Sequence, residues 1–204
     1  TLSGIKYSLI ISNDMVVFSN SIGDITAVDE QTGLILWQLP TQSSNIINET
    51  YNFKNSKIVS DGNSIYFSNN KNEFYSIDAK TGTTNWTNEI NSTITPIIIN
   101  NLIFTVSEEG YLYVIEKNEG NIIRISNLFT SYKEKIRKNL KPIGFAIGNL
   151  NLYLTNSNGD IIVADLNSGS ILNKKKIGNN LISRPFIYNN SLFVVRNGSI
   201  VKYN

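Results

Sequence analysis

A motif of fourteen residues occurs four times along the chain, and this repetition restricts the fold more than any other feature of the sequence. The copies are D-I-T-A-V-D-E-Q-T-G-L-I-L-W at Asp24–Trp37, E-F-Y-S-I-D-A-K-T-G-T-T-N-W at Glu73–Trp86, Y-L-Y-V-I-E-K-N-E-G-N-I-I-R at Tyr111–Arg124 and D-I-I-V-A-D-L-N-S-G-S-I-L-N at Asp160–Asn173. Their turn glycines are 49, 38 and 49 residues apart. A repeat of this period is typical of architectures built from one recurring supersecondary unit.

Each copy predicts two strands joined by a tight turn. Alternation of Ile25 and Ala27 with Thr26 and Val28 favours a strand with one face more buried than the other. The glycine supplies positive φ, and the acidic residue four positions before it can accept hydrogen bonds from the turn backbone. The residues expected to build the turns are Asp29, Gly33, Asp78, Gly82, Glu116, Gly120, Asp165 and Gly169.

Tryptophan follows the turn glycine by four positions in the first two copies, as Trp37 and Trp86. The next two copies have Arg124 and Asn173 at this position. A large apolar ring at a recurring strand position favours packing between neighbouring units, so both tryptophans are predicted to be structural.

Each of the first four units reads as a strand, a turn, two further strands and a closing strand after the motif turn. The units are expected at 8–39, 56–89, 93–126, 141–176 and, with room for only three strands, 184–204. Four-stranded antiparallel units of this length match the blades of a β-propeller. The predicted fold is therefore all-β, a single partial β-propeller over residues 1–204 with an arc of four blades and a three-stranded fifth.

Composition excludes several classes of function. The chain has no cysteine and no histidine, which removes disulfides, Cys/His zinc sites and histidine-based catalysis. A formal net charge of +2 gives no support for nucleic-acid binding, and no apolar run reaches the roughly 18 residues of a membrane span.

The carboxylates give no sign of an active site. All seven aspartates lie in repeat turns or in links between strands: Asp14, Asp24, Asp29, Asp61, Asp78, Asp160 and Asp165. A catalytic carboxylate is expected away from the repeat positions. We therefore expect no catalytic, cofactor-binding or metal-binding residue and no enzyme activity.

The repeat resembles those named after the quinone-dependent alcohol dehydrogenases, and the resemblance covers nearly the whole chain. The ending S-R-P-F-I-Y-N-N-S-L-F-V-V-R-N-G-S-I-V-K-Y, from Ser183 to Tyr203, looks like the C-terminal blade of the BamB family of outer-membrane assembly lipoproteins. Members of that family are eight-bladed rings. The resemblance implies that this chain corresponds to the C-terminal half of such a ring.

The resemblance also implies a function. BamB-like proteins are non-catalytic scaffolds on the periplasmic side of the outer membrane, held by a lipidated N-terminal cysteine that this sequence lacks, and they dock on the periplasmic domains of BamA. They thereby assist the assembly and insertion of outer-membrane β-barrel proteins. The positions nearest to the family's contact segments are Leu2, Ile5 and Lys6 before the first unit, and Glu49, Tyr51 and Phe53 in the long connection that follows it.

Other interpretations stay open at this point. The same blades occur in quinone-dependent (PQQ) dehydrogenases, which need calcium and a quinone, and in unrelated adaptor propellers.

An arc of blades would leave apolar flanks uncovered, which predicts self-association of this fragment. The basic segments 132–141 and 174–176 are either solvated loops, the simpler interpretation, or a surface for anionic lipid headgroups or an acidic partner.

Overall fold

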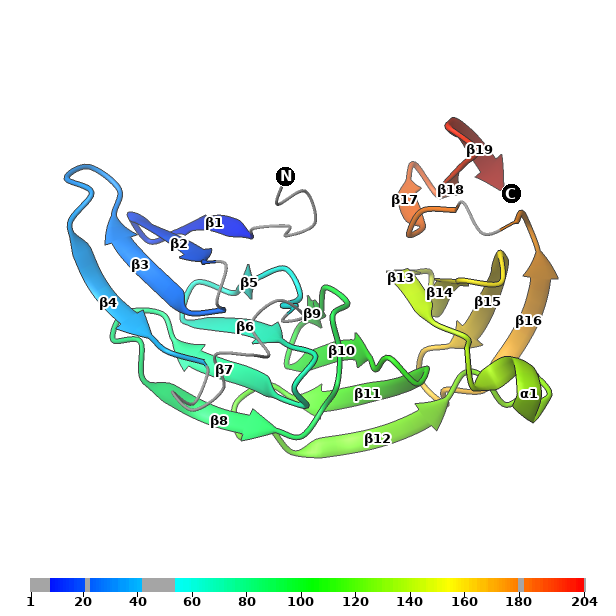
Figure 1. Cartoon of the computed structure of the whole chain (residues 1–204), viewed down its shortest axis with the longest axis horizontal. Coiled ribbons are helices and arrows are strands. Elements are labelled where there is room, and N and C mark those ends of the chain that lie inside the picture. The colour runs from blue at the N-terminus through cyan, green and yellow to red at the C-terminus, as the bar shows by residue number, and fades with distance from the viewer. Residues whose placement is uncertain (1–7, 21–22, 42–53, 180–181, 204) are drawn as a thin grey trace. The chain divides into compact units, whose positions relative to one another are not determined.

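The computed structural model describes residues 8–20, 23–41, 54–179 and 182–203, and nearly all of its regular structure is β-sheet (Figure 1). Within this described part, the one helix is the short α1 (Glu134–Arg137). The chain divides into two compact units. The first comprises Thr1–Ile103 and Glu116–Asn121, and the second comprises Phe104–Ile115 and Ile122–Asn204.

The strands form five sheets, and the strands of each sheet follow one another in the sequence. The first contains β1 (Leu9–Ser12), β2 (Met15–Ser19), β3 (Ile25–Asp29) and β4 (Ile35–Leu39). The second contains β5 (Val59–Ser60), β6 (Ser64–Ser68), β7 (Phe74–Asp78) and β8 (Thr84–Asn88). The third contains β9 (Ile97–Ile99), β10 (Leu102–Val106), β11 (Tyr111–Glu116) and β12 (Ile122–Asn127).

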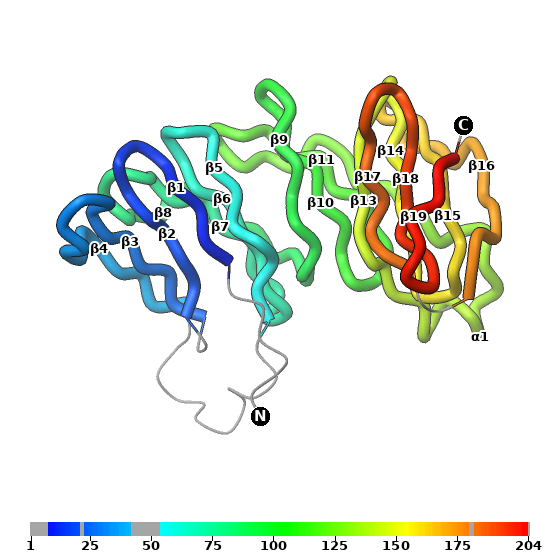
Figure 2. Tube along the Cα trace, turned by 90° about the horizontal axis from the view of Figure 1, so that it is seen from above, coloured from blue at the N-terminus to red at the C-terminus, as the bar shows by residue number. Residues whose placement is uncertain are grey.

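The fourth sheet contains β13 (Pro142–Gly148), β14 (Asn151–Asn156), β15 (Asp160–Asp165) and β16 (Ile171–Lys176). The fifth has three strands, β17 (Phe186–Tyr188), β18 (Ser191–Arg196) and β19 (Ser199–Tyr203), which lie side by side in Figure 2. The predicted all-β class, with four four-stranded sheets and a three-stranded fifth, is confirmed.

The first strand of the second sheet, β5, has two residues and is shorter than the first strands of the other sheets. It is shorter because the amide of Ile58 donates to Ser8 Oγ, at 2.8 Å, in place of a strand partner. Both basic segments that were expected as solvated loops contain regular structure, since segment 132–141 contains α1 and segment 174–176 forms the end of β16.

In each copy the acidic residue closes the motif turn with its backbone carbonyl oxygen and with its carboxylate. Asp29 O accepts from Gly33 N at 2.9 Å, and Asp29 Oδ1 accepts from Thr32 N at 2.7 Å and from Thr32 Oγ1 at 2.6 Å. The bonds from Thr32 favour the ionised carboxylate and lower the pKa of Asp29. The structure places equivalent carboxylate bonds at Asp78, Glu116 and Asp165.

Each motif turn is accompanied by a β-bulge just before the acidic residue. The register between β3 and β4 shifts between Ala27 and Val28, and the other four-stranded sheets shift at the corresponding place. The shift leaves Ala27 opposite Trp37. Because a bulge re-aims the side chains that follow the turn, it directs the indole toward the neighbouring sheet.

Within the first unit, each tryptophan joins one sheet to the turn of the next repeat. Trp37 Nε1 donates to Ala79 O at 3.0 Å, and Trp86 Nε1 donates to Lys117 O at 3.0 Å. Both carbonyls belong to the residue directly after the turn carboxylate. Trp37 is only 9% exposed and completes the core between the first two sheets. That core is formed by Met15, Val17, Ile25, Ala27, Trp37, Ile58, Ile65, Phe67, Ile77 and Ala79.

Arg124 stands at the tryptophan position of the third copy and makes the equivalent contact within the second unit. Its Nη2 donates to Leu166 O at 2.7 Å, and its Nη1 donates to Asn167 O. Leu166 follows the turn carboxylate Asp165, as Ala79 follows the carboxylate of the second copy. The guanidinium therefore replaces the indole N–H at the same backbone acceptor.

The turn glycines leave room for these rings. A Cβ on Gly82 would lie 2.6 Å from Trp37 Cδ2, whereas a Cβ on Gly33 would meet no atom within 4 Å. Both glycines have positive φ, +74° and +70°. Gly33 and Gly82 thus have the same backbone conformation, but only Gly82 lies against an indole ring.

We expect Gly82→Ala to lower the free energy of unfolding by about 1 to 3 kcal/mol more than Gly33→Ala, because only Gly82→Ala adds a clash with Trp37 to the strain of positive φ. Urea melts of both variants measure the difference. Equal losses would contradict the close approach of the ring to the turn.

We expect Arg124→Ala to destabilise the fold by about 1 to 3 kcal/mol, because two backbone carbonyls lose a charged donor. Arg137→Ala, which removes an exposed arginine of α1, is the matched control and should have little effect. If both variants melt at the same urea concentration, Arg124 does not replace the tryptophan.

Candidate functional site

The residues predicted to contact a partner lie outside the described residues. They are Leu2, Ile5, Lys6, Glu49, Tyr51 and Phe53. Their role stays a prediction.

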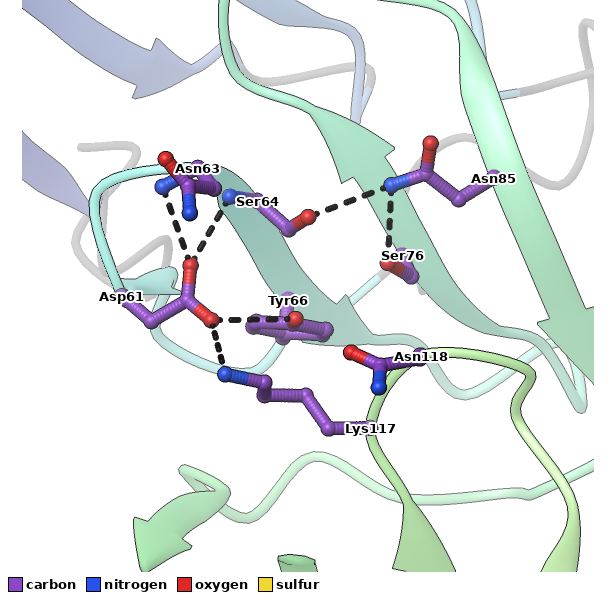
Figure 3. A pocket seen from close by; sticks show the side chains of 8 residues that line it. All are labelled: Asp61, Asn63, Ser64, Tyr66, Ser76, Asn85, Lys117 and Asn118. Carbon is purple, nitrogen blue, oxygen red and sulfur yellow. Dashed lines mark hydrogen bonds and ion pairs between the residues drawn. The ribbon is translucent and has the colours of Figure 1, made fainter. Parts of the chain in front are cut away.

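A polar pocket of about 250 Å³ lies in the first unit, where the turn between β5 and β6 faces the motif turn of the third copy (Figure 3). It is lined by Asp61, Asn63, Ser64, Tyr66, Ser76, Asn85, Lys117 and Asn118. The lining residues come from two repeats, so the pocket requires the folded unit.

Local sequence explains the position of the pocket's acidic residue. Asp61 begins the dense turn D-G-N, and its Oδ1 accepts from Asn63 N at 3.0 Å and from Ser64 N at 2.8 Å. These bonds fix the carboxylate and leave Oδ2 directed at the neighbouring repeat, as Figure 3 shows. There Oδ2 forms an ion pair with Lys117 Nζ at 2.7 Å and accepts a longer hydrogen bond from Tyr66 OH at 3.4 Å.

The ion pair stays charged near neutral pH. Burial opposes ionisation of Asp61, but the bond from Lys117 and the amides of Ser64 and Asn63 outweigh it and lower the pKa of the carboxyl group. The bond to Asp61 raises the pKa of Lys117. Neither group is therefore poised as a general acid or base at neutral pH.

The opposite wall of the pocket is a network of neutral polar groups. Asn85 Nδ2 lies 3.2 Å from both Ser64 Oγ and Ser76 Oγ. Burial raises the pKa of Tyr66, which keeps its hydroxyl protonated. The pocket can exchange hydrogen bonds with a small polar molecule, and its side chains hold two turns together.

The sequence pattern missed a second group of repeat residues. Asn20 Oδ1 accepts from Asp24 N at 2.9 Å, Asn69 Oδ1 from Glu73 N at 3.2 Å and Asn156 Oδ1 from Asp160 N at 3.3 Å. Each asparagine closes the link that enters the third strand of its sheet. The sequence contains the pattern that predicts these links, because each of the three asparagines stands four positions before the first residue of its motif copy.

Two other kinds of site are absent from the described part of the chain. Among those residues, no group of three or more histidine, cysteine, aspartate or glutamate side chains could hold a metal ion. In the same residues, no helix is both long and apolar enough to cross a membrane.

The family model described as "Outer membrane protein assembly factor BamB" matches residues 5–126, which is more than half of the chain. The chain belongs to this family. The match includes the first three copies of the motif and both tryptophans. None of the curated proteins matches the chain.

Solved structures support the same fold. BamB from Moraxella catarrhalis is 16% identical, with a TM-score of 0.60 over 95% of this chain and 67% of that chain. The computationally designed Ika8 protein is 14% identical, with a TM-score of 0.72 over 96% and 57%. The Cps50 (Swd1) β-propeller domain of Myceliophteria thermophila is 11% identical, with a TM-score of 0.66 over 92% and 60%.

At these identities the likeness shows the fold, which is the β-propeller fold. The chain spans between 57% and 67% of the length of the three solved structures.

We expect Asp61→Asn to lower the free energy of unfolding by about 1 kcal/mol or less near pH 6, because it removes the charge that pairs with Lys117. The folded pKa of Asp61 lies below its unfolded value, so this stabilisation is present above the unfolded pKa and is lost as pH falls through the folded pKa. The difference between wild type and variant should therefore shrink near pH 3.

Urea melts at both pH values measure this change. Asp14→Asn, which alters an exposed carboxylate in a hairpin turn, is the control. A difference that is the same at both pH values would show that the ion pair does not contribute to stability.

Proposed function

We propose that this chain is a non-catalytic protein-interaction scaffold that assists the assembly of outer-membrane β-barrel proteins by docking on BamA. The family match over residues 5–126 carries the proposal, because the matching family is described as an outer-membrane assembly factor. The fold agrees with it, since repeated blades present many loops for contact with other proteins.

The use of the carboxylates supports a non-catalytic role. Asp29, Asp78, Glu116 and Asp165 accept hydrogen bonds from their own turns, which lower the pKa of each carboxyl group. The carboxylate of Asp61 forms an ion pair with Lys117, with 2.7 Å between Oδ2 and Nζ. Carboxylates held in this way stabilise turns and are poorly suited to accept a proton from a substrate near neutral pH.

The proposed location is the periplasmic side of the outer membrane, where the family works. A lipid anchor upstream of this chain would hold the protein there. The proposed contact with BamA uses the two segments that resemble the family's contact regions, namely Leu2, Ile5 and Lys6, and Glu49, Tyr51 and Phe53. Tyr51 and Phe53 are the strongest candidates for anchors, because aromatic side chains often dominate protein–protein binding energy.

The test is titration calorimetry of the complete protein against the purified periplasmic domains of BamA. We expect saturable binding in the micromolar range or tighter, and a loss of about 1 to 3 kcal/mol of binding free energy in the double variant Tyr51→Ala, Phe53→Ala. Tyr188→Ala, in which an exposed tyrosine of β17 is removed, is the matched control and should bind like wild type.

The same protein sample is tested for uptake of quinone and calcium. Absence of binding to BamA together with retained quinone would overturn the proposal and place the protein with the quinone-dependent dehydrogenases. Binding that is unchanged in the double variant would keep the scaffold function and exclude this contact segment.

A further inference from the structure

Charge is distributed unequally between the two compact units. The first unit contains six Lys and Arg residues against eleven Asp and Glu residues, whereas the second contains twelve against five. The small net charge of the whole chain therefore conceals a strongly basic second unit. Most of its cations lie in two segments, 133–141 and 174–176.

Side-chain contacts bring these two segments together. Lys174 Nζ donates to Ser131 O at 3.3 Å and lies 4.2 Å from the centre of the Tyr132 ring. Tyr132 is the residue before Lys133, which is the N-cap residue of α1. In Figures 1 and 2, α1 accordingly lies beside β16, the strand that carries Lys174.

Buried hydrogen bonds fix this arrangement. The Tyr132 ring is buried, and its hydroxyl donates to Asp160 Oδ2 at 2.7 Å and accepts from Asn156 Nδ2 at 2.8 Å. Asp160 Oδ2 also accepts from Asn158 Nδ2 at 2.9 Å. The segment that leads into α1 is thus anchored on the fourth sheet, so the nearby cations occupy a defined surface.

Lys176 extends this surface along the strand. It lies two residues from Lys174 on β16, so both side chains point to the same face, and its Nζ donates to Asn158 O. We define the cationic surface as Lys133, Lys135, Arg137, Lys138, Lys174 and Lys176, all of which are exposed. The one acidic residue within α1, Glu134, pairs with Lys138 at 3.0 Å.

The composition of the cationic surface favours a membrane over a discrete acidic protein. Five of its six cations are lysines, which act as hydrated point charges on flexible stems, whereas bidentate recognition of carboxylates favours arginine. Apolar side chains are exposed beside the charges, Ile136 within α1 at 45% and Leu172 on β16 at 59%. Exposed lysines with interspersed apolar side chains match the charged headgroups and apolar boundary of a lipid surface.

We propose that the cationic surface binds the headgroup layer of an anionic phospholipid membrane, with Ile136 and Leu172 entering the boundary between headgroups and acyl chains. Clusters of four to eight cations are sufficient for such binding. The proposal rests on the second unit's own residues and does not depend on docking to BamA.

The first experiment measures co-sedimentation of the purified 204-residue chain with vesicles. One set is phosphatidylcholine alone, and the other contains about 30% phosphatidylglycerol, each at about 50 mM and about 500 mM salt. We expect binding to the anionic vesicles at low salt, little binding to the neutral ones, and strong weakening by salt.

The second experiment distinguishes the contribution of the cationic surface to vesicle binding from the contribution of the protein's net charge. The variant Lys133→Gln, Lys135→Gln, Arg137→Gln should bind the anionic vesicles about tenfold to a hundredfold more weakly. The control Lys54→Gln, Lys57→Gln, Lys80→Gln removes the same charge from exposed positions of the first unit and should change binding by less than about threefold. Circular dichroism and urea melts verify that both variants fold as wild type does.

Three results would overturn the proposal. The first is no binding to anionic vesicles at low salt, and the second is an equal loss in both variants. The third is saturable binding to a soluble poly-glutamate peptide without binding to vesicles, which would instead identify an acidic protein segment as the partner.

Discussion

The rest of the first unit depends on one recurring interaction, in which a side chain after one motif turn donates a hydrogen bond to the backbone of the next motif turn. Trp37 donates to Ala79 O and Trp86 to Lys117 O, both at 3.0 Å. A single sheet cannot bury both of its faces, so its stability requires a neighbour. The indole supplies apolar area and a directed bond at once, which fixes how far one sheet lies from the next turn.

Arg124 shows which part of this interaction the fold requires. The guanidinium has a different shape from an indole, yet it reaches the equivalent carbonyl at Leu166, 2.7 Å away, from the same motif position. At this junction the hydrogen-bond donor is kept and the apolar indole ring is not. The exchange also adds a cation to the second unit, in keeping with that unit's basic character.

The contacts between turns also explain how the candidate pocket arises. Lys117 accepts the bond from Trp86 through its carbonyl and pairs with Asp61 through its ammonium group at 2.7 Å. One residue thus joins the structural contact to the polar pocket. The turn carboxylates and Asp61 are thus all engaged in bonds that hold the turns in place.

The sequence by itself determined the repeats, the strand pairing within each sheet and the residues of the motif turns, because these depend on short-range rules: apolar alternation, positive φ at glycine and acceptors close to the turn amides. The sequence also predicted that the tryptophans pack between repeats, but the tertiary structure alone decided which groups the linking side chains contact. Neither the pairing of Asp61 with Lys117 nor the bond from Arg124 to Leu166 follows from local pattern, since their partners lie far apart in the chain. The meeting of Lys174 with Tyr132 likewise exists only because packing of the fourth sheet buries the tyrosine and turns two separate basic segments into one surface.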